Sequence, residues 1–274
     1  MRITLRVWVA LAVVVGAPAP VRGAELEAKT AAAFDRYVRV AEARMASETS
    51  DRGRFLLVDR KPGAERTAVL ERLRSGEIVM DRLRERDGDR DIDVPGGLVH
   101  HWAGTVFLPG VRVGDAVALM QDYDRHRTLF APAVVRSVLL ARHGDQFQVA
   151  LRFHMKKIVS VTVDTENDAR FTTFEPGRVA SAIRSIRVQE VDQAGTPAEQ
   201  VKPEGRGGGY MWRLNTYWRY LERDGGTYVQ CESITLSRDI PLGFGWLIGP
   251  FVTSIPRESL TFTMEGLRKA LVAR

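Results

Sequence analysis

Two adjacent histidines, His100 and His101, are the residues in this chain that most suggest metal chemistry. They lie in an apolar stretch that predicts a β-strand, and neighbouring residues of a strand point to opposite faces. The pair therefore cannot hold one ion together. His126, His143 and His154 are not spaced as ligands of one another. We predict no metal site.

An acidic ladder follows a helical segment near the N-terminus. Asp87, Asp89, Asp91 and Asp93 alternate as at the start of a calcium loop, but Ile92 stands where such a loop needs its turn glycine. Asp-Gly at 87–88 is also a strong hairpin signal. The ladder therefore predicts the solvated edge of a hairpin.

Signatures of covalent or phosphate chemistry are missing from the sequence. The glycine run 205–209 (GRGGG) leads into a strand, whereas dinucleotide-binding glycines open a helix. No G-x-S-x-G pattern occurs. Cys231, the single cysteine, lies in a predicted strand and fits a packed small residue better than a nucleophile. We predict no cofactor.

One predicted strand is unusually aromatic. In residues 210–220, alternation places Trp212, Leu214, Trp218 and Tyr220 on one face, either as ordinary core or as the aromatic wall of a ligand pocket. Glu232 in the next strand is in phase with apolar neighbours, and Arg184 lies in an earlier strand. Charged groups on an inward face need partners. The two could therefore pair with each other or orient a ligand.

The elements that must position these residues follow from periodicity. From Leu98 onward the chain predicts a strand, a helix over 113–122, a short helical piece over 128–135, and a run of strands with Gly-containing turns, which implies antiparallel neighbours. In the strand over 146–155 one face is apolar and the other wet. A final amphipathic helix begins near Pro256 and carries Leu260, Met264, Leu267 and Leu271 in one stripe.

The N-terminus has the pattern of a secretory signal peptide. Arg2 and Arg6 precede a short apolar run over 7–16, and small or apolar residues stand at 21 and 23. Without this segment the net charge of +6 falls to nearer +3. No long basic run is present, so we predict no nucleic-acid partner.

The uncharged segment 240–256 (IPLGFGWLIGPFVTSIP) is the most unusual stretch of the chain. Its three glycines and three prolines argue against a helix that spans a membrane. It predicts either a buried connection under the rim of the sheet or an apolar lip, including Trp246 and Phe251, that touches a ligand or, transiently, a membrane.

The order of these elements resembles the START-like helix-grip superfamily, also called SRPBCC. Three segments carry the resemblance: GTVFLPG at 104–110, the helix pair through 121–124 and 129–132, and IPRESL at 255–260 leading into the last helix. The superfamily includes lipid-transfer domains, plant-allergen-like binders, coenzyme Q-binding proteins and polyketide aromatase/cyclases. The chain looks most like an exported bacterial branch, for which no substrate can be carried over.

The resemblance implies an α+β fold in which a curved antiparallel sheet wraps around a long C-terminal helix. We predict a signal peptide over 1–23, a small N-terminal cap of helix, short helix and hairpin over 24–97, and the helix-grip domain over 98–274. The expected location is the periplasm or the exterior of the cell.

We predict a binding or transport protein that holds a lipid, isoprenoid or aromatic molecule between the sheet and the last helix. The alternatives are an enzyme similar to the aromatase/cyclases, or a structural module with a filled core. The expected ligand-binding residues are Phe153, Arg184, Trp212, Leu214, Trp218, Tyr220, Glu232, Ile234, Trp246, Phe251 and Met264.

Overall fold

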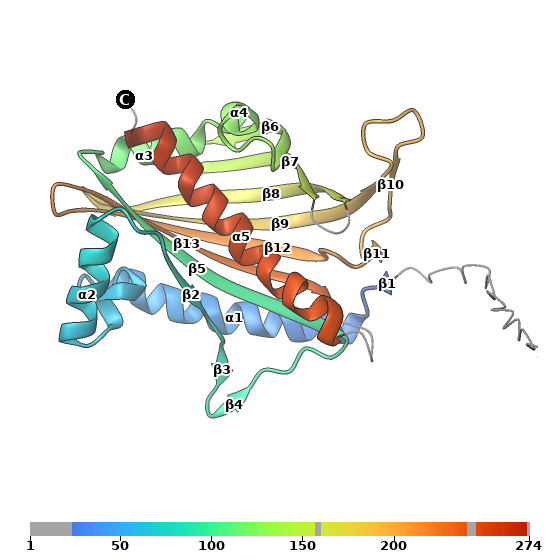
Figure 1. Ribbon diagram of the computed structural model, residues 1–274, viewed down its shortest axis with the longest axis horizontal. Helices are drawn as coiled ribbons and strands as arrows, with labels where there is room; N and C mark the ends of the chain where they lie inside the picture. Colours follow the sequence, from blue (N-terminus) through green and yellow to red (C-terminus); the bar gives the residue numbers. More distant parts are fainter. Residues whose placement is uncertain (1–23, 157–159, 240–244, 273–274) are drawn as a thin grey trace, which may run out of the picture.

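The structure is a computed structural model that describes residues 24–156, 160–239 and 245–272, and of residues 245–253 it describes the backbone course alone. The predicted signal peptide lies outside the described residues. In the described part, one large sheet has the order β2-β5-β13-β12-β9-β8-β7-β6, with β10 beside β9 and every pairing antiparallel. Figure 1 shows this sheet, open at its two edges, with α5 crossing it diagonally.

The strands of the large sheet are β2 (Val79–Arg82), β5 (Gly97–Pro109), β6 (Val134–His143), β7 (Gln146–Lys156), β8 (Ser160–Glu175), β9 (Arg178–Asp192), β10 (Gln200–Val201), β12 (Arg213–Arg223) and β13 (Gly226–Arg238). Two short pairs stand apart from it: β1 (Ala24–Glu25) with β11 (Arg206–Gly207), and β3 (Arg86–Asp87) with β4 (Arg90–Asp91). The helical elements are α1 (Ala28–Ser50), η1 (Leu57–Arg60), α2 (Gly63–Arg74), α3 (Val113–Gln121), η2 (Tyr123–Arg125), α4 (His126–Leu129) and α5 (Gly245–Val272).

The turns show why the strands end where they do. Asp224 and Gly225 join β12 to β13 with φ angles of 58° and 75°, the geometry of the tight hairpin turn that Asp-Gly favours. Asn167-Asp168 predicts either a turn or a point at which two predicted strands merge, and the structure shows the merged strand. β8 runs straight through the pair, and the irregularity is absorbed by a register shift against β9 between Glu166 and Asn167.

Helix α5 covers one face of the sheet, which we call the inner face. Leu260, Met264 and Leu267 are buried against it, as their stripe predicts. Gly104 of β5 allows the close approach, because a Cβ atom there would come within 3.2 Å of Leu260 Cγ. The predicted arrangement of an antiparallel sheet against a long C-terminal helix is confirmed.

The start of α5 differs from the prediction. The helix begins at Gly245 and includes Pro250 and Pro256, whereas Pro256 was expected in its first turn. Residues 240–244 lie outside the described residues. No helix within the described ranges is long and apolar enough to cross a bilayer.

The opposite face of the sheet, the outer face, is covered by the N-terminal segment. Helix α1 buries Phe34, Tyr37, Val38 and Ala41 in a cluster with side chains of β12 and β13. Near the other end of the sheet, η1 and α2 form a second outer cluster. The central strands are therefore buried on both faces, which the alternation seen in β7 alone did not indicate.

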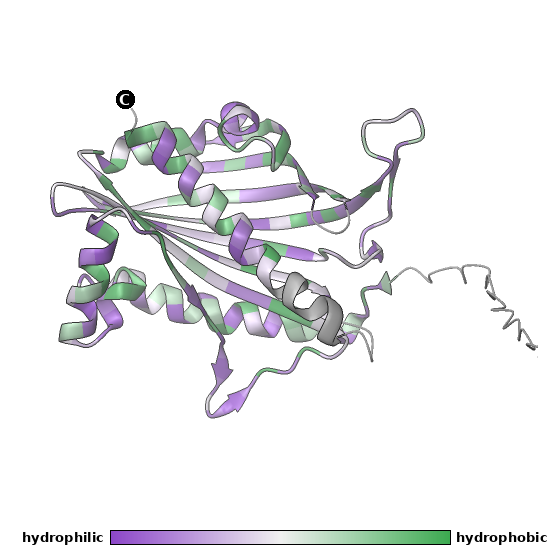
Figure 2. Ribbon diagram, viewed as in Figure 1, coloured by the Kyte–Doolittle hydropathy of each residue, from purple (hydrophilic) through white to green (hydrophobic). Residues whose placement is uncertain are grey.

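The hairpin β3–β4 projects from this segment and is hydrophilic (Figure 2). Two residues of its acidic ladder pair with arginines: Asp91 contacts Arg84 and Arg86, and Asp87 contacts Arg36 of α1. This agrees with the solvated hairpin edge predicted from the sequence.

Candidate functional site

A row of four side chains crosses the inner face in the middle of the sheet. The row runs across four neighbouring strands, and each residue stands opposite the next: Trp102 of β5, Ser233 of β13, Thr216 of β12 and Ile183 of β9. We call these four residues the inner row. All four are half-buried, although central strands below a helix are normally closed to solvent.

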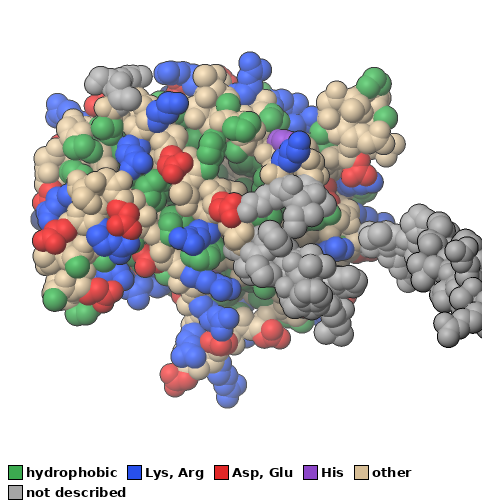
Figure 3. All heavy atoms as spheres, viewed as in Figure 1, with side chains coloured by type: hydrophobic (Ala, Val, Ile, Leu, Met, Phe, Trp, Pro, Cys, Tyr) green, Lys and Arg blue, Asp and Glu red, His purple; other side chains and the backbone are tan. Residues whose placement is uncertain are grey.

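Helix α5 passes close to the inner row. The guanidinium of Arg257 lies 5.9 Å from the ring centroid of Trp102, and Leu260 packs one row further along at Gly104. On this side of the molecule, hydrophobic side chains show at the surface between α5 and the β6–β7 edge (Figure 3). The inner row is therefore one part of the inner face that stays accessible beside the described side chains of α5.

Towards α3 and α4 the same face is closed. Trp218 and Cys231, in the row next to the inner row, are 4% and 1% exposed. Tyr220 follows with no exposed surface, and its ring stacks on Trp218 with centroids 6.3 Å apart. This end of the inner face is thus closed by the protein's own aromatic side chains.

Cys231 is buried at this closed end and forms no disulfide. Burial raises the pKa of its thiol well above the ordinary value, which keeps the thiol protonated. The interpretation of Cys231 as a packed residue is consistent with this position.

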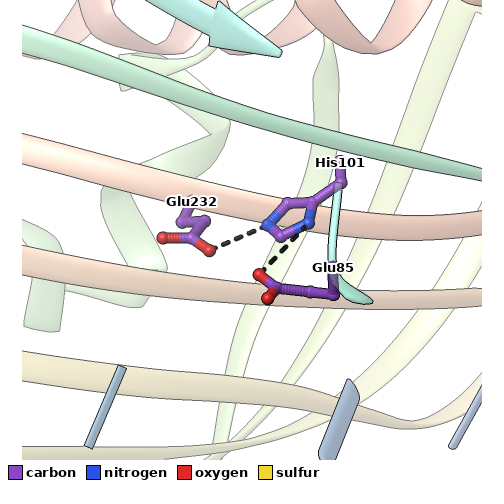
Figure 4. A group of neighbouring side chains, drawn as sticks. All are labelled: Glu85, His101 and Glu232. Atoms are coloured by element: carbon purple, nitrogen blue, oxygen red, sulfur yellow. Dashed lines mark hydrogen bonds and ion pairs between the residues drawn. The ribbon is translucent and has the colours of Figure 1, made fainter. Parts of the chain in front are cut away.

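On the outer face a buried ionic network joins α1 to the sheet. We call Arg44, Glu48, Glu85, His101 and Glu232 the outer network. His101 Nε2 lies 2.8 Å from Glu232 Oε1, and its Nδ1 lies 4.0 Å from Glu85 Oε1 (Figure 4). Arg44 donates to Glu85 at 2.7 Å, to Glu48 at 3.1 Å, and also to Glu232. The carboxylates thus share one guanidinium.

Hydrogen bonds fix the orientation of His101. The Tyr37 hydroxyl accepts the N–H of Glu85 at 3.0 Å and lies 2.9 Å from His101 Nδ1. With the imidazole proton on Nε2, the ring donates to Glu232 and accepts from Tyr37, so every donor in this series of bonds finds an acceptor.

The outer network could resemble a metal centre. Glu85, His101 and Glu232 each place a donor atom within 4.8 Å of the others. Arg44, however, donates to both carboxylates and so fills the position that a cation would take. We interpret the network as an ionic connection that holds α1 on the sheet.

The charge state of Glu232 follows from these contacts. Burial acts to raise its pKa, but the hydrogen bonds from His101 and Arg44 and the attraction to the Arg44 guanidinium outweigh burial and lower the pKa to about 2. Glu232 is therefore ionised at neutral pH, although it is 1% exposed.

Two hollows stand out among the described residues, and neither lies between the sheet and α5. One, of about 310 Å³, is open on the outer face between α1 and strands β8, β9 and β12. Within it Glu42 accepts hydrogen bonds from Arg184 Nε at 2.6 Å and from the Tyr217 hydroxyl at 2.7 Å. The other lies at the N-terminal turn of α3, where Glu222 already accepts the N–H of Val113.

The structure divides the sequence-predicted ligand residues between the two faces. Those on the inner face are Phe153, Leu214, Trp218, Tyr220 and Met264. Those on the outer face are Arg184, Trp212, Glu232 and Ile234. The side chains of Trp246 and Phe251 lie outside the described residues. The eleven positions therefore do not form one pocket.

Two expectations about individual residues are corrected. Trp212 does not share a face with Trp218, because it precedes β12, donates its N–H to Leu236 O and packs in the α1 cluster. Arg184 and Glu232 do not pair with each other. Arg184 binds Glu42, and Glu232 binds Arg44 and His101.

None of the four inner-row residues was among the ligand residues predicted from the sequence, and the partners of His101 were not predicted either. The signal for the row was present: Thr216 and Ser233 are small polar residues in the same phase as Trp218 and Cys231. His100 and His101 do point to opposite faces, as predicted, since His100 bonds Ser237 at 3.0 Å and His101 bonds Tyr37.

His126, at the closed end, gives a prediction about acid stability. Burial lowers its pKa to about 4, against 6.5 ordinarily, so between these values the unfolded chain takes up the proton first. Stability should fall as the pH drops from about 6.5 to about 4, by about 3 kcal/mol for this group.

The measurement is urea unfolding of wild type and His126→Leu across this pH range. The variant should show a correspondingly smaller loss, whereas His143→Leu at an exposed position should match wild type. An unchanged slope in His126→Leu would contradict the assignment.

Comparison with known proteins gives likeness in fold alone. No family model matches the sequence, and no curated protein matches it. Similar solved structures include a STAR-related lipid transfer protein fragment from Xanthomonas axonopodis, at 17% identity and TM-score 0.44 over 68% of this chain and 98% of that one. A START superfamily protein from Mycobacterium smegmatis has 12% identity and TM-score 0.42 over 63% and 97%. The Zhui aromatase/cyclase from Streptomyces sp. R1128 has 12% identity and TM-score 0.43 over 64% and 94%.

Proposed function

We propose that this protein binds a hydrophobic small molecule in the space between the inner face of the sheet and α5. The observation that carries the proposal is the half-burial of the inner row in the middle of the sheet. Surface of this kind, largely apolar with a few placed hydroxyls and covered by a helix, is typical of a ligand site.

The neighbours of the inner row support an apolar occupant. Leu151 and Phe153 of β7 and Leu214 of β12 are also half-buried on the inner face. Covering such side chains with an apolar ligand contributes about 25 cal/mol per Å² of buried area before the costs of association. The ligand would complete a core that the chain leaves unfinished at this end of the sheet.

Two finer parts of the proposal rest on sequence. Export to the periplasm or beyond is supported by the charged start and short apolar run of residues 1–16. Transient contact with a membrane is supported by the uncharged, aromatic composition of 240–256, which leads into and forms the first turns of α5. Cell fractionation tests the first part, and sedimentation with vesicles tests the second.

Binding is tested with N-phenylnaphthylamine, an uncharged probe that fluoresces in apolar surroundings. Ile183→Glu places a charge in the inner row and should weaken probe binding by about tenfold or more, since a buried unpaired charge is strongly unfavourable. Ile186→Glu is the matched control, because Ile186 is 54% exposed on the same strand. We expect the control to bind as wild type does.

Two results would count against the proposal. One is that wild type does not bind the probe. The other is that folded Ile183→Glu binds it as tightly as Ile186→Glu. Mass spectrometry of material extracted from the purified protein would then identify the natural ligand where binding is found.

A further inference from the structure

Four buried polar atoms at the closed end of the inner face have no hydrogen-bond partner among the described residues. They are the hydroxyl oxygens of Tyr123, Ser181 and Tyr220 and Nε2 of His126. Each of these residues is at most 5% exposed. Buried polar groups are almost always hydrogen-bonded, so four such atoms in one region indicate a missing partner.

The four residues lie together. The rings of Tyr123 and His126 have centroids 4.9 Å apart. Tyr123 acts electrostatically on Tyr220, and the Ser181 hydroxyl lies near enough to lower the pKa of Tyr220, although it does not meet hydrogen-bond geometry. We call the hydroxyls of Tyr123, Ser181 and Tyr220 the deep hydroxyls.

The deep hydroxyls adjoin the space assigned to the ligand. Ser181 stands opposite Trp218, in the row next to the inner row, and is two residues from Ile183 on the same strand. A ligand lying on the inner row with one end directed towards α3 and α4 would therefore bring that end to Ser181 and the ring of Trp218, and it would reach the hydroxyls of Tyr123 and Tyr220 once that ring moves aside.

The surroundings of the deep hydroxyls are uncharged. Burial raises the pKa of both tyrosines, and burial lowers the pKa of His126 to about 4, so all three are neutral near pH 7. The row next to the inner row on the closed side runs through Gly104, Cys231, Trp218, Ser181 and Phe171 and carries no Asp, Glu, Lys or Arg. The inner row itself continues to Arg82 of β2, opposite Trp102, and to Arg142 of β6, opposite Phe147, so its two charged groups lie at the edges of the sheet.

The charged groups at the edge of this region do not favour an anion. Asp122 is the carboxylate that acts on His126, and it would repel one. Arg142 contacts the ring of Phe147 at 4.8 Å, but its side chain is exposed and its Nε donates to Gly144 O. A carboxylate or phosphate buried among the deep hydroxyls would have no cation as a partner in the described part of the chain.

We infer that the ligand carries an uncharged hydrogen-bonding group, a carbonyl or a hydroxyl, which binds the hydroxyls of Tyr123, Ser181 and Tyr220. This rests on the proposed function and adds the chemical class: a neutral lipid-like molecule with a polar end, as opposed to a fatty acid or a phospholipid. A hydroxyl group can donate a hydrogen bond to a carbonyl oxygen, and it can act as either donor or acceptor towards an alcohol.

The test is displacement of N-phenylnaphthylamine from the full protein at neutral pH. The competitors are a methyl ketone, an alcohol, a carboxylate and an alkane of equal chain length. The ketone and the alcohol should displace the probe at concentrations about tenfold lower than the carboxylate and the alkane, as expected for about one well-made buried hydrogen bond.

Variants locate the effect. Tyr220→Phe and Tyr123→Phe should each reduce the advantage of the ketone over the alkane severalfold, measured against the affinity of the same variant for the probe. Tyr228→Phe is the matched control, because Tyr228 is equally buried but faces outward and its hydroxyl donates to Asp224 at 2.7 Å. The comparison among competitors needs wild type alone, so it stands even where a variant fails to fold.

The two proposals fail differently. Absence of probe binding removes the proposed function and this inference with it. Probe binding with a carboxylate that competes as well as the ketone, or with Tyr220→Phe and Tyr123→Phe both indistinguishable from wild type, overturns the inference alone. In that case water satisfies the deep hydroxyls.

Discussion

Replacing Arg44 by Met should destabilise the protein by about 3 to 5 kcal/mol, the loss measured when one partner is removed from a buried ion pair. Arg44 is the cation shared by Glu48, Glu85 and Glu232, and Glu232 is 1% exposed. Without the guanidinium, ionised carboxylates would remain in the interior between α1 and the sheet. Urea unfolding at pH near 7 measures the loss.

The matched control is Arg36→Met on the same helix. Arg36 pairs with Asp87, and both side chains are about half exposed. Exposed ion pairs contribute at most about 1 kcal/mol, so this variant should unfold close to wild type. Equal losses in the two variants would show that the outer network does not stabilise the attachment of α1.

The pH dependence of the Arg44→Met defect provides a second check. The pKa of Glu232 is held at about 2 in the folded protein and is ordinarily 4.5, so its contribution to stability is present above pH 4.5 and is lost as the pH falls towards 2. In Arg44→Met that contribution is already reduced. The difference between variant and wild type should therefore shrink as the pH is lowered through this range.

The sequence predicts the order of elements well because each signal is local. Alternation in β7, the Asp-Gly turn before β13 and the stripe of α5 all depend on neighbours within a few residues. The start of α5 is the exception. Proline favours the first turn of a helix, which is why Pro256 predicted the start, yet packing of an amphipathic face stabilises helices more than local propensity does.

The sequence could not assign the faces of the sheet to their partners. Alternation separates Trp218 and Tyr220 from Glu232 and Ile234, but it does not say which set meets α5 and which meets α1. That choice depends on where the N-terminal helix packs. Its apolar stripe shows that one side of the helix is buried, but the stripe does not show against which face of the sheet. The error at Trp212 has a different cause: the alternation of β12 was extended one residue beyond its start at Arg213.

Part of the inner row could have been recognised from the sequence alone. Thr216 interrupts an apolar phase between Leu214 and Trp218 in β12, and Ser233 stands opposite it in β13, in a phase that also contains Thr227 and Thr235. A polar interruption of this kind marks either a partner side chain or a ligand. Distinguishing the two needs the register between strands, which places Trp102 and Ile183 in the same row.

Leu267→Ala should destabilise the protein by about 2 to 5 kcal/mol, because truncating a fully buried leucine removes apolar burial and leaves a cavity. Leu267 has no exposed surface and lies with Met264 in the cluster between α5 and the sheet. Leu271→Ala is the matched control, since Leu271 lies one turn further along the same helix and is half-buried. We expect its cost to be well below that of Leu267→Ala.

The same pair of variants connects stability to binding. Leu260, Met264 and Leu267 anchor the C-terminal part of α5 to the closed end of the inner face, while the inner row lies further towards the start of the helix. If α5 acts as the cover of the ligand space, loosening its anchor should raise the rate at which N-phenylnaphthylamine dissociates. Stopped-flow dilution measures that rate. A Leu267→Ala protein that is less stable but releases the probe as slowly as Leu271→Ala would show that α5 does not gate the space.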